Sequence, residues 1–402
     1  MPGVPNPTFF RRDLLLSAAG SLPFFKARRA SAAARQYLVY WGTYTAGGTR
    51  YGTCDSKGIY VSRFDAVTGS LSAPALAAET ANPSYLAIHP LQRFLYAVNE
   101  HIDPTGKVMG EVSSFSIDRQ TGKLTELNRV SSRGGMPCHI CTDQSGKVLA
   151  VANWSTGSTA AFPIRKNGTL GKATGFYQHS GERSGGTSPG QAIQVHCHAV
   201  VVSPDNRFLI ATDTGLNKVF VHRLDVDGGT FAPHDPACLG LQNPANPRHL
   251  VFHPNAKWAY VANEANPGCT VLNYDPGTGV FAVAAVTRTV PEGTTGRISP
   301  AEAVMHPTGR FVYVSNRGHD SIAVLRIDPA SGSLTLVEAF QPDGSGPRSF
   351  NIDPTGKWLF ALMQRSNSIV PLQIDRATGK LARAGNSPSL PSPVCAKFVG
   401  VG

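Results

Sequence analysis

One short phrase recurs seven times along this 402-residue chain, at residues 64–71, 117–124, 164–170, 224–231, 274–281, 327–334 and 374–381. Each copy has an apolar residue, usually an acidic one, a turn containing glycine, and an apolar residue that resumes a strand. Glycine takes the positive φ that a tight hairpin turn needs. The turn glycines lie 46 to 61 residues apart (Gly69, Gly122, Gly168, Gly229, Gly279, Gly332 and Gly379). A period near 50 residues, made only of strands and turns, predicts an all-β fold: a seven-bladed β-propeller with four-stranded blades.

A second phrase, a turn followed by a strand of alternating apolar residues, keeps step with the first. Its six full copies begin at His89, Asp143, Ser203, His253, His306 and Asp353. A seventh copy, YLVYWGTYT from Tyr37, lacks the turn, and residues 393–399 read as a strand with no blade after it. Pairing these two ends within one blade closes the ring and hides both sheet edges. We therefore expect residues 35–402 to form a single seven-bladed domain.

Residues 1–34 resemble a twin-arginine export signal. The motif FFRRDLLL begins at Phe9, a modest apolar stretch follows, and small residues at 31–34 offer a cleavage site. A disordered tail is the alternative, whereas a membrane-spanning helix is disfavoured because the apolar run is short and contains Pro23. We expect an exported protein, periplasmic or secreted, without stable membrane insertion once the signal is removed.

The net charge favours a small anionic ligand. The chain carries +11, and five basic residues and one acidic residue within 1–34 supply +4 of it, which leaves about +7 for the domain. No basic run, stacking-aromatic motif or nucleic-acid-binding signature accompanies this charge. We expect no nucleic-acid partner, and the sequence leaves the oligomeric state open.

The seven cysteines are scattered, and a large propeller core does not require disulfides. Cys138 and Cys141 form a CxxC pair, but the repeat places them in ordinary strand positions, and no second pair matches them. Zinc binding through the segment 196–198 is disfavoured because alternation along a strand points Cys197 away from the two histidines beside it. We expect no metal and no cofactor.

The repeat also predicts where chemistry gathers. Five residues before each turn, where the innermost strands begin, stand Ser84, Cys138, His198, Arg248, Ala301 and Arg348. One position later stand Tyr85, His139, Ala199, His249, Glu302 and Ser349. Eleven residues after the start of each turn, where the next strands end, stand Glu100, Trp154, Thr214, Glu264, Arg317 and Gln364. Because consecutive strands are antiparallel, all these positions are expected to open on one face of the ring.

The residue types at these positions differ from blade to blade, whereas the apolar residues inside the strands repeat. This pattern is typical of a repeated scaffold that carries one asymmetric site. We expect a basic cluster of His198, Arg248, Glu264, Arg317 and Arg348, with Glu100, His139, His196, His249 and Glu302 nearby. The alternative is a wet channel rim held together by ion pairs.

Over nearly all of residues 37–399 the chain is similar to the seven-bladed lactonase family that contains bacterial 6-phosphogluconolactonase and carboxymuconate cyclase. The shared phrases include GTYT from Gly42, NPSYLA from Asn82, AVNE from Ala97, PCH from Pro137, HCH from His196, PRH from Pro247, ANE from Ala262 and VSNRG from Val314. The resemblance implies that His198 (or His196), Arg248, Glu264 and Arg317 line the active site.

The function expected from these residues is hydrolysis of a sugar or acidic lactone, as in 6-phosphogluconolactonase. His198 is the expected general base, Glu264 orients it or the attacking water, and Arg248 and Arg317 hold the oxyanion or a substrate anion. The remaining polar residues of the cluster are expected to bind the substrate: Glu100, His139, His196, His249, Glu302 and Arg348. A muconate-type lactonising cyclase and a non-catalytic ligand- or protein-binding propeller are the alternatives. The Gly/Ser-rich stretch 181–190 lengthens the third blade and is expected to cover the mouth as a mobile flap.

Overall fold

The structure is a computed structural model that describes residues 35–46, 54–101, 109–187, 192–242 and 244–401. The chain divides into a unit Met1–Ala32, which lies outside the described residues together with the whole expected export signal, and a unit Ala33–Gly402. Strands and turns make up the described part of the second unit, and it contains no helix able to cross a membrane.

Seven four-stranded antiparallel sheets form this unit, as the repeat predicted. The first is β4 (Leu86–Ile88), β5 (Phe94–Asn99), β6 (Glu111–Ile117) and β7 (Leu124–Ser131). The second is β8 (Pro137–Thr142), β9 (Val148–Asn153), β10 (Ser158–Pro163) and β11 (Gly175–Gln178). The third is β12 (Cys197–Val202), β13 (Phe208–Asp213), β14 (Lys218–Asp225) and β15 (Thr230–Gly240). The fourth is β16 (Pro247–Phe252), β17 (Trp258–Asn263), β18 (Gly268–Asp275) and β19 (Val280–Arg288).

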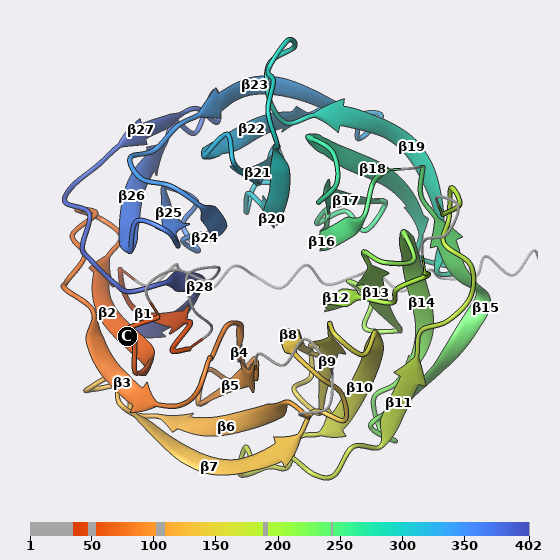
Figure 1. Ribbon diagram of the computed structural model, residues 1–402. Helices are drawn as coiled ribbons and strands as arrows, with labels where there is room; N and C mark the ends of the chain where they lie inside the picture. Colours follow the sequence, from red (N-terminus) through yellow and green to blue (C-terminus); the bar gives the residue numbers. More distant parts are fainter. Residues whose placement is uncertain (1–34, 47–53, 102–108, 188–191, 243, 402) are drawn as a thin grey trace, which may run out of the picture. The chain divides into compact units, whose positions relative to one another are not determined.

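The remaining sheets continue the ring. The fifth is β20 (Ser299–Met305), β21 (Phe311–Arg317), β22 (Ser321–Ile327) and β23 (Leu334–Phe340). The sixth is β24 (Pro347–Ile352), β25 (Trp358–Met363), β26 (Ser368–Ile374) and β27 (Leu381–Arg383). The seventh is β28 (Pro393–Val401), β1 (Gln36–Thr43), β2 (Gly58–Asp65) and β3 (Ala75–Glu79). Figure 1 shows the sheets as blades around a central axis, with β4, β8, β12, β16, β20, β24 and β28 innermost.

The seventh blade confirms the predicted ring closure. Strand β28, from the end of the chain, pairs antiparallel with β1, from its start, in a register that runs from Gln36–Val401 to Thr43–Pro393. Its one irregularity lies between Gly42 and Thr43. Each end of the sequence therefore completes the sheet of the other, and neither edge is left open within the ring.

All seven turn glycines have positive φ, between 65° and 86°, which is the backbone state predicted from the repeat. Most of them also pack against an aromatic residue of the preceding blade. A Cβ at Gly332, for example, would stand 2.4 Å from the ring of Trp258, and the hydroxyl of Tyr260 donates to the Gly332 carbonyl over 3.0 Å. The hairpin phrase therefore encodes the contact between neighbouring blades as well as the turn.

The core lies between the blades, because each sheet buries both faces. One apolar cluster joins Tyr260 and Val271 of the fourth blade to Val312 and Leu325 of the fifth, all of them fully buried. Histidines at the other turns add polar contacts between blades. Nε2 of His306 lies 2.9 Å from the carbonyl oxygen of Gly356 on the next blade.

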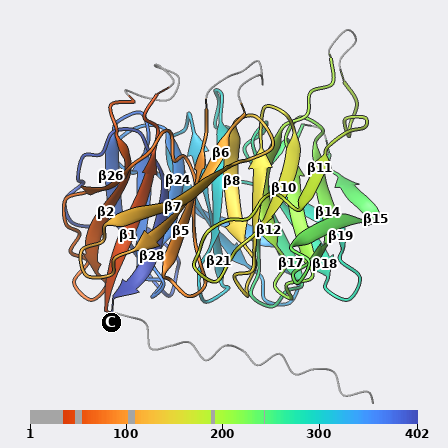
Figure 2. The same cartoon turned by 90° about the horizontal axis from the view of Figure 1, so that it is seen from below.

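The innermost strands position the site. Six of them carry a register shift at their first residues, as between Cys197 and Ala199 in β12 and between Pro247 and Leu250 in β16. At these β-bulges the strand twists and re-aims its side chains. Figure 2, at right angles to the first view, shows the inner strands running between the two faces of the ring.

Candidate functional site

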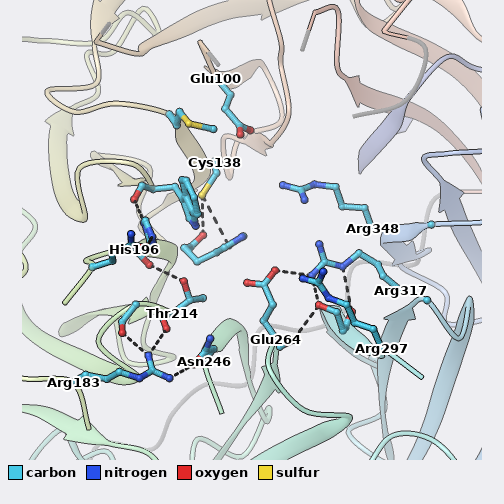
Figure 3. A pocket seen from close by; sticks show the side chains of 18 of the residues that line it. Glu100, Cys138, Arg183, His196, Thr214, Asn246, Glu264, Arg297, Arg317 and Arg348 are labelled. Atoms are coloured by element: carbon cyan, nitrogen blue, oxygen red, sulfur yellow. Dashed lines mark hydrogen bonds and ion pairs between the residues drawn. The ribbon is translucent and has the colours of Figure 1, made fainter. Parts of the chain in front are cut away.

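A cavity of about 1150 Å³ opens where the innermost strands begin and the next strands end. We call it the mouth pocket. It brings together six of the ten predicted site residues, which line it directly: Glu100, His196, His198, Glu264, Arg317 and Arg348. Glu100 and Arg348, 248 positions apart in sequence, therefore meet at one face of the ring, as the repeat predicted. Figure 3 shows these side chains converging from different blades.

Glu264 and Arg317 form an ion pair at the wall of the pocket. Nη2 of Arg317 lies 2.7 Å from Oε1 of Glu264, and both side chains stay partly exposed, at 23% for Arg317 and 30% for Glu264. Ser299 fixes the arginine, because its hydroxyl and its carbonyl oxygen accept bonds from Nη2 and Nε at 2.8 and 3.2 Å. Burial opposes ionisation of Glu264, but Arg317 and Arg248 outweigh it and lower the pKa of this carboxyl group. Glu264 is therefore an anion at neutral pH.

Arg348 lies next to Arg317 on the same side of the pocket in Figure 3. Its Nη2 donates to the Tyr44 hydroxyl over 3.1 Å, and its guanidinium lies 5.6 Å from the centre of the Tyr44 ring. The Tyr44 hydroxyl in turn donates to Glu100 over 2.9 Å. Burial raises the pKa of Glu100, while Arg348 acts in the opposite direction. The two carboxylates of the pocket thus have different environments, which is a common basis for dividing acid and base roles.

His198 is 5% exposed and lies on the pocket floor. Its Nδ1 is 4.0 Å from the Cys138 thiol, and its Nε2 has no hydrogen-bond partner among the described residues. Burial, followed by the charge of Arg248, lowers the pKa of His198 well below its usual value. The imidazole is therefore neutral at pH 7 and can accept a proton.

His196 occupies a different place, on the pocket wall. Its ring stacks on Trp154, with centroids 4.0 Å apart and planes at 4°. Its Nδ1 lies 3.1 Å from the Trp154 carbonyl oxygen and its Nε2 lies 3.0 Å from the Gln194 side-chain oxygen. Both ring nitrogens have partners, so His196 is less available as a base than His198.

Arg248 does not reach either described pocket, contrary to the expectation that it holds the oxyanion or a substrate anion directly. The side chain is 2% exposed, and its Nη1 donates to the Ala301 carbonyl over 2.6 Å. Burial beneath the floor of the mouth pocket prevents contact with a ligand there. Its charge still acts on the site, because it lowers the pKa values of His198 and Glu264.

His139, His249 and Glu302 are also not where the cluster was expected. They line a second cavity of about 520 Å³, farther along the same inner strands, which shares no lining residue with the mouth pocket. We call it the channel pocket. The reason is that consecutive residues at the start of an inner strand line different pockets. Cys138 lines the mouth pocket and the next residue, His139, lines the channel pocket. Arg348 and Ser349 line the mouth pocket and the channel pocket in the same order.

Sequence reasoning missed several residues in or next to the mouth pocket. Tyr44 does not line the pocket but contacts Arg348 and Glu100, which do. It lies in the shared phrase GTYT, so a signal for it existed. Arg183, Arg297 and Arg365 lie on connections outside the repeat, where only their charge could have flagged them. Within the stretch expected to form a flap, Gly185–Thr187 contribute to the pocket lining, while residues 188–191 lie outside the described residues.

The pocket is strongly basic. Five arginines line its described part (Arg183, Arg297, Arg317, Arg348 and Arg365), against two glutamates (Glu100 and Glu264), a formal balance of +3. Arginine binds carboxylate and phosphate groups through paired donors. The arrangement suits an anionic ligand or a reaction that develops negative charge.

Metal-binding geometry is absent from the described residues, since no group of three His, Cys, Asp or Glu side chains could hold an ion. All seven cysteines are free. Cys197 is fully buried, its thiol 3.4 Å from the Thr159 hydroxyl, so it does not join the flanking histidines.

Comparison with known proteins agrees with this geometry. The family model described as "Lactonase, 7-bladed beta-propeller" matches residues 38–398. The chain belongs to this lactonase family. A 6-phosphogluconolactonase from Bacillus subtilis (strain 168) is 33% identical over 370 residues, which cover 90% of this chain and 99% of that protein.

Solved structures of lactonase-family proteins are similarly close. The periplasmic gluconolactonase of Pseudomonas aeruginosa has a TM-score of 0.82 and 32% identity, covering 91% of this chain and all of that one. A putative 6-phosphogluconolactonase from Bacteroides fragilis has a TM-score of 0.81 and 31% identity, covering 92% of this chain and 99% of that one.

Proposed function

We propose that this lactonase-family protein hydrolyses a sugar or acidic lactone in the mouth pocket. The observation that carries the proposal is the meeting of a neutral His198, an ionised Glu264 and the guanidinium groups of Arg317 and Arg348 around one cavity. The names of the relatives support the same reaction class, since they include 6-phosphogluconolactonases and a gluconolactonase.

The proposed first step is attack of water on the lactone carbonyl. Nε2 of His198 accepts one proton of the water as its oxygen bonds to the carbonyl carbon. The carbonyl oxygen becomes an oxyanion, which Arg317 and Arg348 stabilise through charge-assisted hydrogen bonds. Glu264 keeps Arg317 in place through their ion pair.

In the second step the tetrahedral intermediate collapses. The bond between the carbonyl carbon and the ring oxygen breaks, and the imidazolium of His198 returns its proton to that oxygen. The product is the open hydroxy acid, whose carboxylate loses its proton to solvent. Arg248 contributes through its charge, which keeps the resting imidazole of His198 neutral.

We further propose that the substrate carries, or develops near the reaction centre, a negative charge, because the pocket lining is formally +3. Export through the signal in residues 1–34 is proposed as well. The periplasmic location of the Pseudomonas aeruginosa relative supports it. Such a location would favour lactones formed outside the cytoplasm over intermediates of cytosolic sugar-phosphate metabolism.

The test is proton release in a weakly buffered solution with a panel of lactones: a neutral aldonolactone, its phosphorylated counterpart and a lactone with a free carboxylate. Wild-type protein is compared with His198→Gln and with the control His319→Gln, whose histidine lies outside the mouth pocket. We expect His198→Gln to lose about 10²–10⁴-fold in kcat, the usual contribution of a general base, and the control to keep its rate.

Two results would contradict the proposal. If His198→Gln hydrolysed every lactone as fast as wild type, the assignment of the base would be wrong. If no lactone were turned over but a cis,cis-muconate were cyclised, the protein would be the lactonising enzyme instead. Absence of turnover with both classes would indicate a non-catalytic ligand-binding propeller.

A further inference from the structure

The channel pocket holds unused hydrogen-bonding capacity at its inner end. Within the described residues, the Tyr85 hydroxyl has no hydrogen-bond partner, and the half-buried ammonium group of Lys397 forms no ion pair. The printed contact of Lys397 is with the face of the Tyr85 ring, 4.6 Å from its centroid. A cation and a hydroxyl therefore meet in one cavity with no acceptor assigned to either.

His139 supplies a third donor to the same cavity. The backbone N–H of Val200 donates to its Nδ1 over 3.4 Å, so Nδ1 acts as the acceptor. Burial lowers the pKa of His139 well below its usual value, and the neutral ring then carries its proton on Nε2. No described residue accepts a bond from this Nε2–H. The ring lies against Tyr85, with centroids 4.1 Å apart, which brings the donors close together.

The one carboxylate of the pocket lining is already satisfied. Oε1 of Glu302 lies 2.6 Å from Nδ1 of His249 and accepts from its own neighbour, the Ala303 N–H, over 3.3 Å. Oε2 accepts from the Ser349 hydroxyl over 2.8 Å. Burial lowers the pKa of His249 to about 4, so this ring is neutral and donates to Glu302. The charge of Lys397 offsets that of Glu302. Nε2 of His249 is then an acceptor, and it has no partner among the described residues. The free groups of the pocket are therefore the three donors and this one acceptor.

Part of the lining of the channel pocket is apolar. Ile88, Val201, Val251 and Val304 line it from four different blades, and all four are half-buried. At about 520 Å³ the cavity has the size of a small-molecule site. An apolar body would rest on these side chains while an acceptor group met the three donors.

We propose that the channel pocket binds a small organic carboxylate with an apolar body, its oxygens facing Tyr85, His139 and Lys397. The site is separate from the mouth pocket and does not depend on the lactonase activity. Its ligand class differs as well: an amphipathic monoanion suits one lysine and an apolar wall, whereas the mouth pocket with five arginines suits a more polar anion.

Benzoate is a suitable probe, with benzamide as its neutral counterpart of the same shape. Binding to the full chain is measured by calorimetry and by ligand-observed NMR. Lys397→Met keeps the apolar stem and removes the charge, and we expect it to weaken benzoate binding about tenfold or more, as for loss of a charge-assisted hydrogen bond. Lys257→Met, at an exposed lysine that lines neither pocket, is the matched control and should leave benzoate affinity unchanged, whereas Arg348→Met reports on binding in the mouth pocket. Benzamide should bind more weakly than benzoate to wild type.

If Lys397→Met does not fold, as judged by its melting curve, Tyr85→Phe removes a single hydroxyl and provides the same test, with an expected loss of about threefold to tenfold. Benzoate affinity unaffected by either variant would overturn the proposal. So would a loss seen only in Arg348→Met, which would place benzoate in the mouth pocket, or no benzoate binding to wild type at all, which would leave the channel to water. Because the readout is binding, failure here is distinct from failure of the lactonase assay.

Discussion

Glu264 and Arg317, carried by adjacent blades, form an ion pair in which Oε1 and Nη2 are 2.7 Å apart at the wall of the mouth pocket. The pair joins the end of β17 to the end of β21, and Ser299 links both residues because its hydroxyl also donates to the Glu264 carbonyl over 3.0 Å. The orientation of Arg317 towards a substrate therefore depends on a carboxylate from another blade.

Arg317→Met should reduce kcat/KM about 10²–10³-fold, as for loss of a donor to a developing oxyanion. Glu264→Gln should cost less, since it keeps a hydrogen-bond acceptor for the arginine. The double variant should lose less than the sum of the two free-energy changes, because the residues act as a unit. Steady-state kinetics on the best lactone of the panel measures all three. Strict additivity would show that the pair does not act jointly.

Arg348 should select for anionic substrates. Arg348→Met removes the guanidinium that faces the pocket beside Tyr44. We expect kcat/KM for a carboxylated or phosphorylated lactone to fall about tenfold to a hundredfold, the usual loss for a hydrogen bond to a charged group, with a smaller effect on a neutral lactone. An equal loss for neutral and anionic substrates would instead place Arg348 at the oxyanion.

The pH profile should report a histidine with a lowered pKa. Since His198 is active when neutral, kcat/KM should stay level as the pH falls from 8 to about 6.5, the usual histidine pKa, and decline only below it. Arg248→Met removes a nearby positive charge, which raises the pKa of His198 and moves the acid limb to higher pH. His319→Gln, which changes a histidine outside the mouth pocket, is the control. An acid limb above pH 6.5 in wild type would argue against this base.

A buried pair that links the second blade to the third should stabilise the segment that carries His196 and His198. Nδ1 of His179 lies 2.8 Å from Oδ2 of Asp213, whose Oδ1 accepts the backbone N–H groups of His196 and Leu216. Asp213→Ala should cost about 3–5 kcal/mol of unfolding free energy, the usual loss when one partner of a buried pair is removed. Urea denaturation measures it, with the exposed Asp227→Ala as a control that should change little.

The same pair sets a pH dependence of stability. Burial opposes ionisation of Asp213, but His179 and the backbone donors outweigh it and lower its pKa. Its stabilising contribution is therefore complete above the unfolded aspartate pKa of about 3.9 and is lost as the pH falls through the lower, folded value. Asp213→Asn should make unfolding less dependent on pH in this acidic range.

The turn glycines should tolerate substitution less than other glycines of similar backbone. Gly332 and Gly293 both have positive φ, 73° and 78°, but a Cβ at Gly332 meets Trp258 at 2.4 Å while one at Gly293 meets nothing within 4 Å. Gly293→Ala should cost roughly 1–2 kcal/mol for the backbone alone. Gly332→Ala should cost roughly 1–3 kcal/mol more, for overpacking between blades. Equal melting temperatures for the two variants would contradict this account.

The fold could be predicted because its signal is repeated. Seven hairpin phrases such as the one at Gly332 report the same turn and the same contact between blades, and the unpaired strand at residues 393–399 required a partner at the chain start. Periodicity of this kind depends on local backbone chemistry, which the sequence carries directly.

The site was predicted only in part. The repeat shows which blade carries a residue, but it shows less precisely how far along the central channel that residue lies. Positions 138 and 139 are neighbours in one strand, yet the structure sends one to the mouth pocket and the other to the channel pocket. Arg248 occupies a mouth-facing slot in the repeat but is buried beneath the floor. Arg297 and Arg365 lie on connections between strands. These connections differ from blade to blade, so aligning the repeats does not predict where their side chains lie.

The pairing of β1 with β28 has a consequence for how the protein is made. During synthesis the first three strands of the seventh blade emerge long before their inner partner, so their shared sheet has an open edge until the last residues leave the ribosome. Pairing over such a sequence separation is slow. Sealing of the ring therefore follows the synthesis of β28, and any pathway that transports this domain in its native form must wait until that strand has been made.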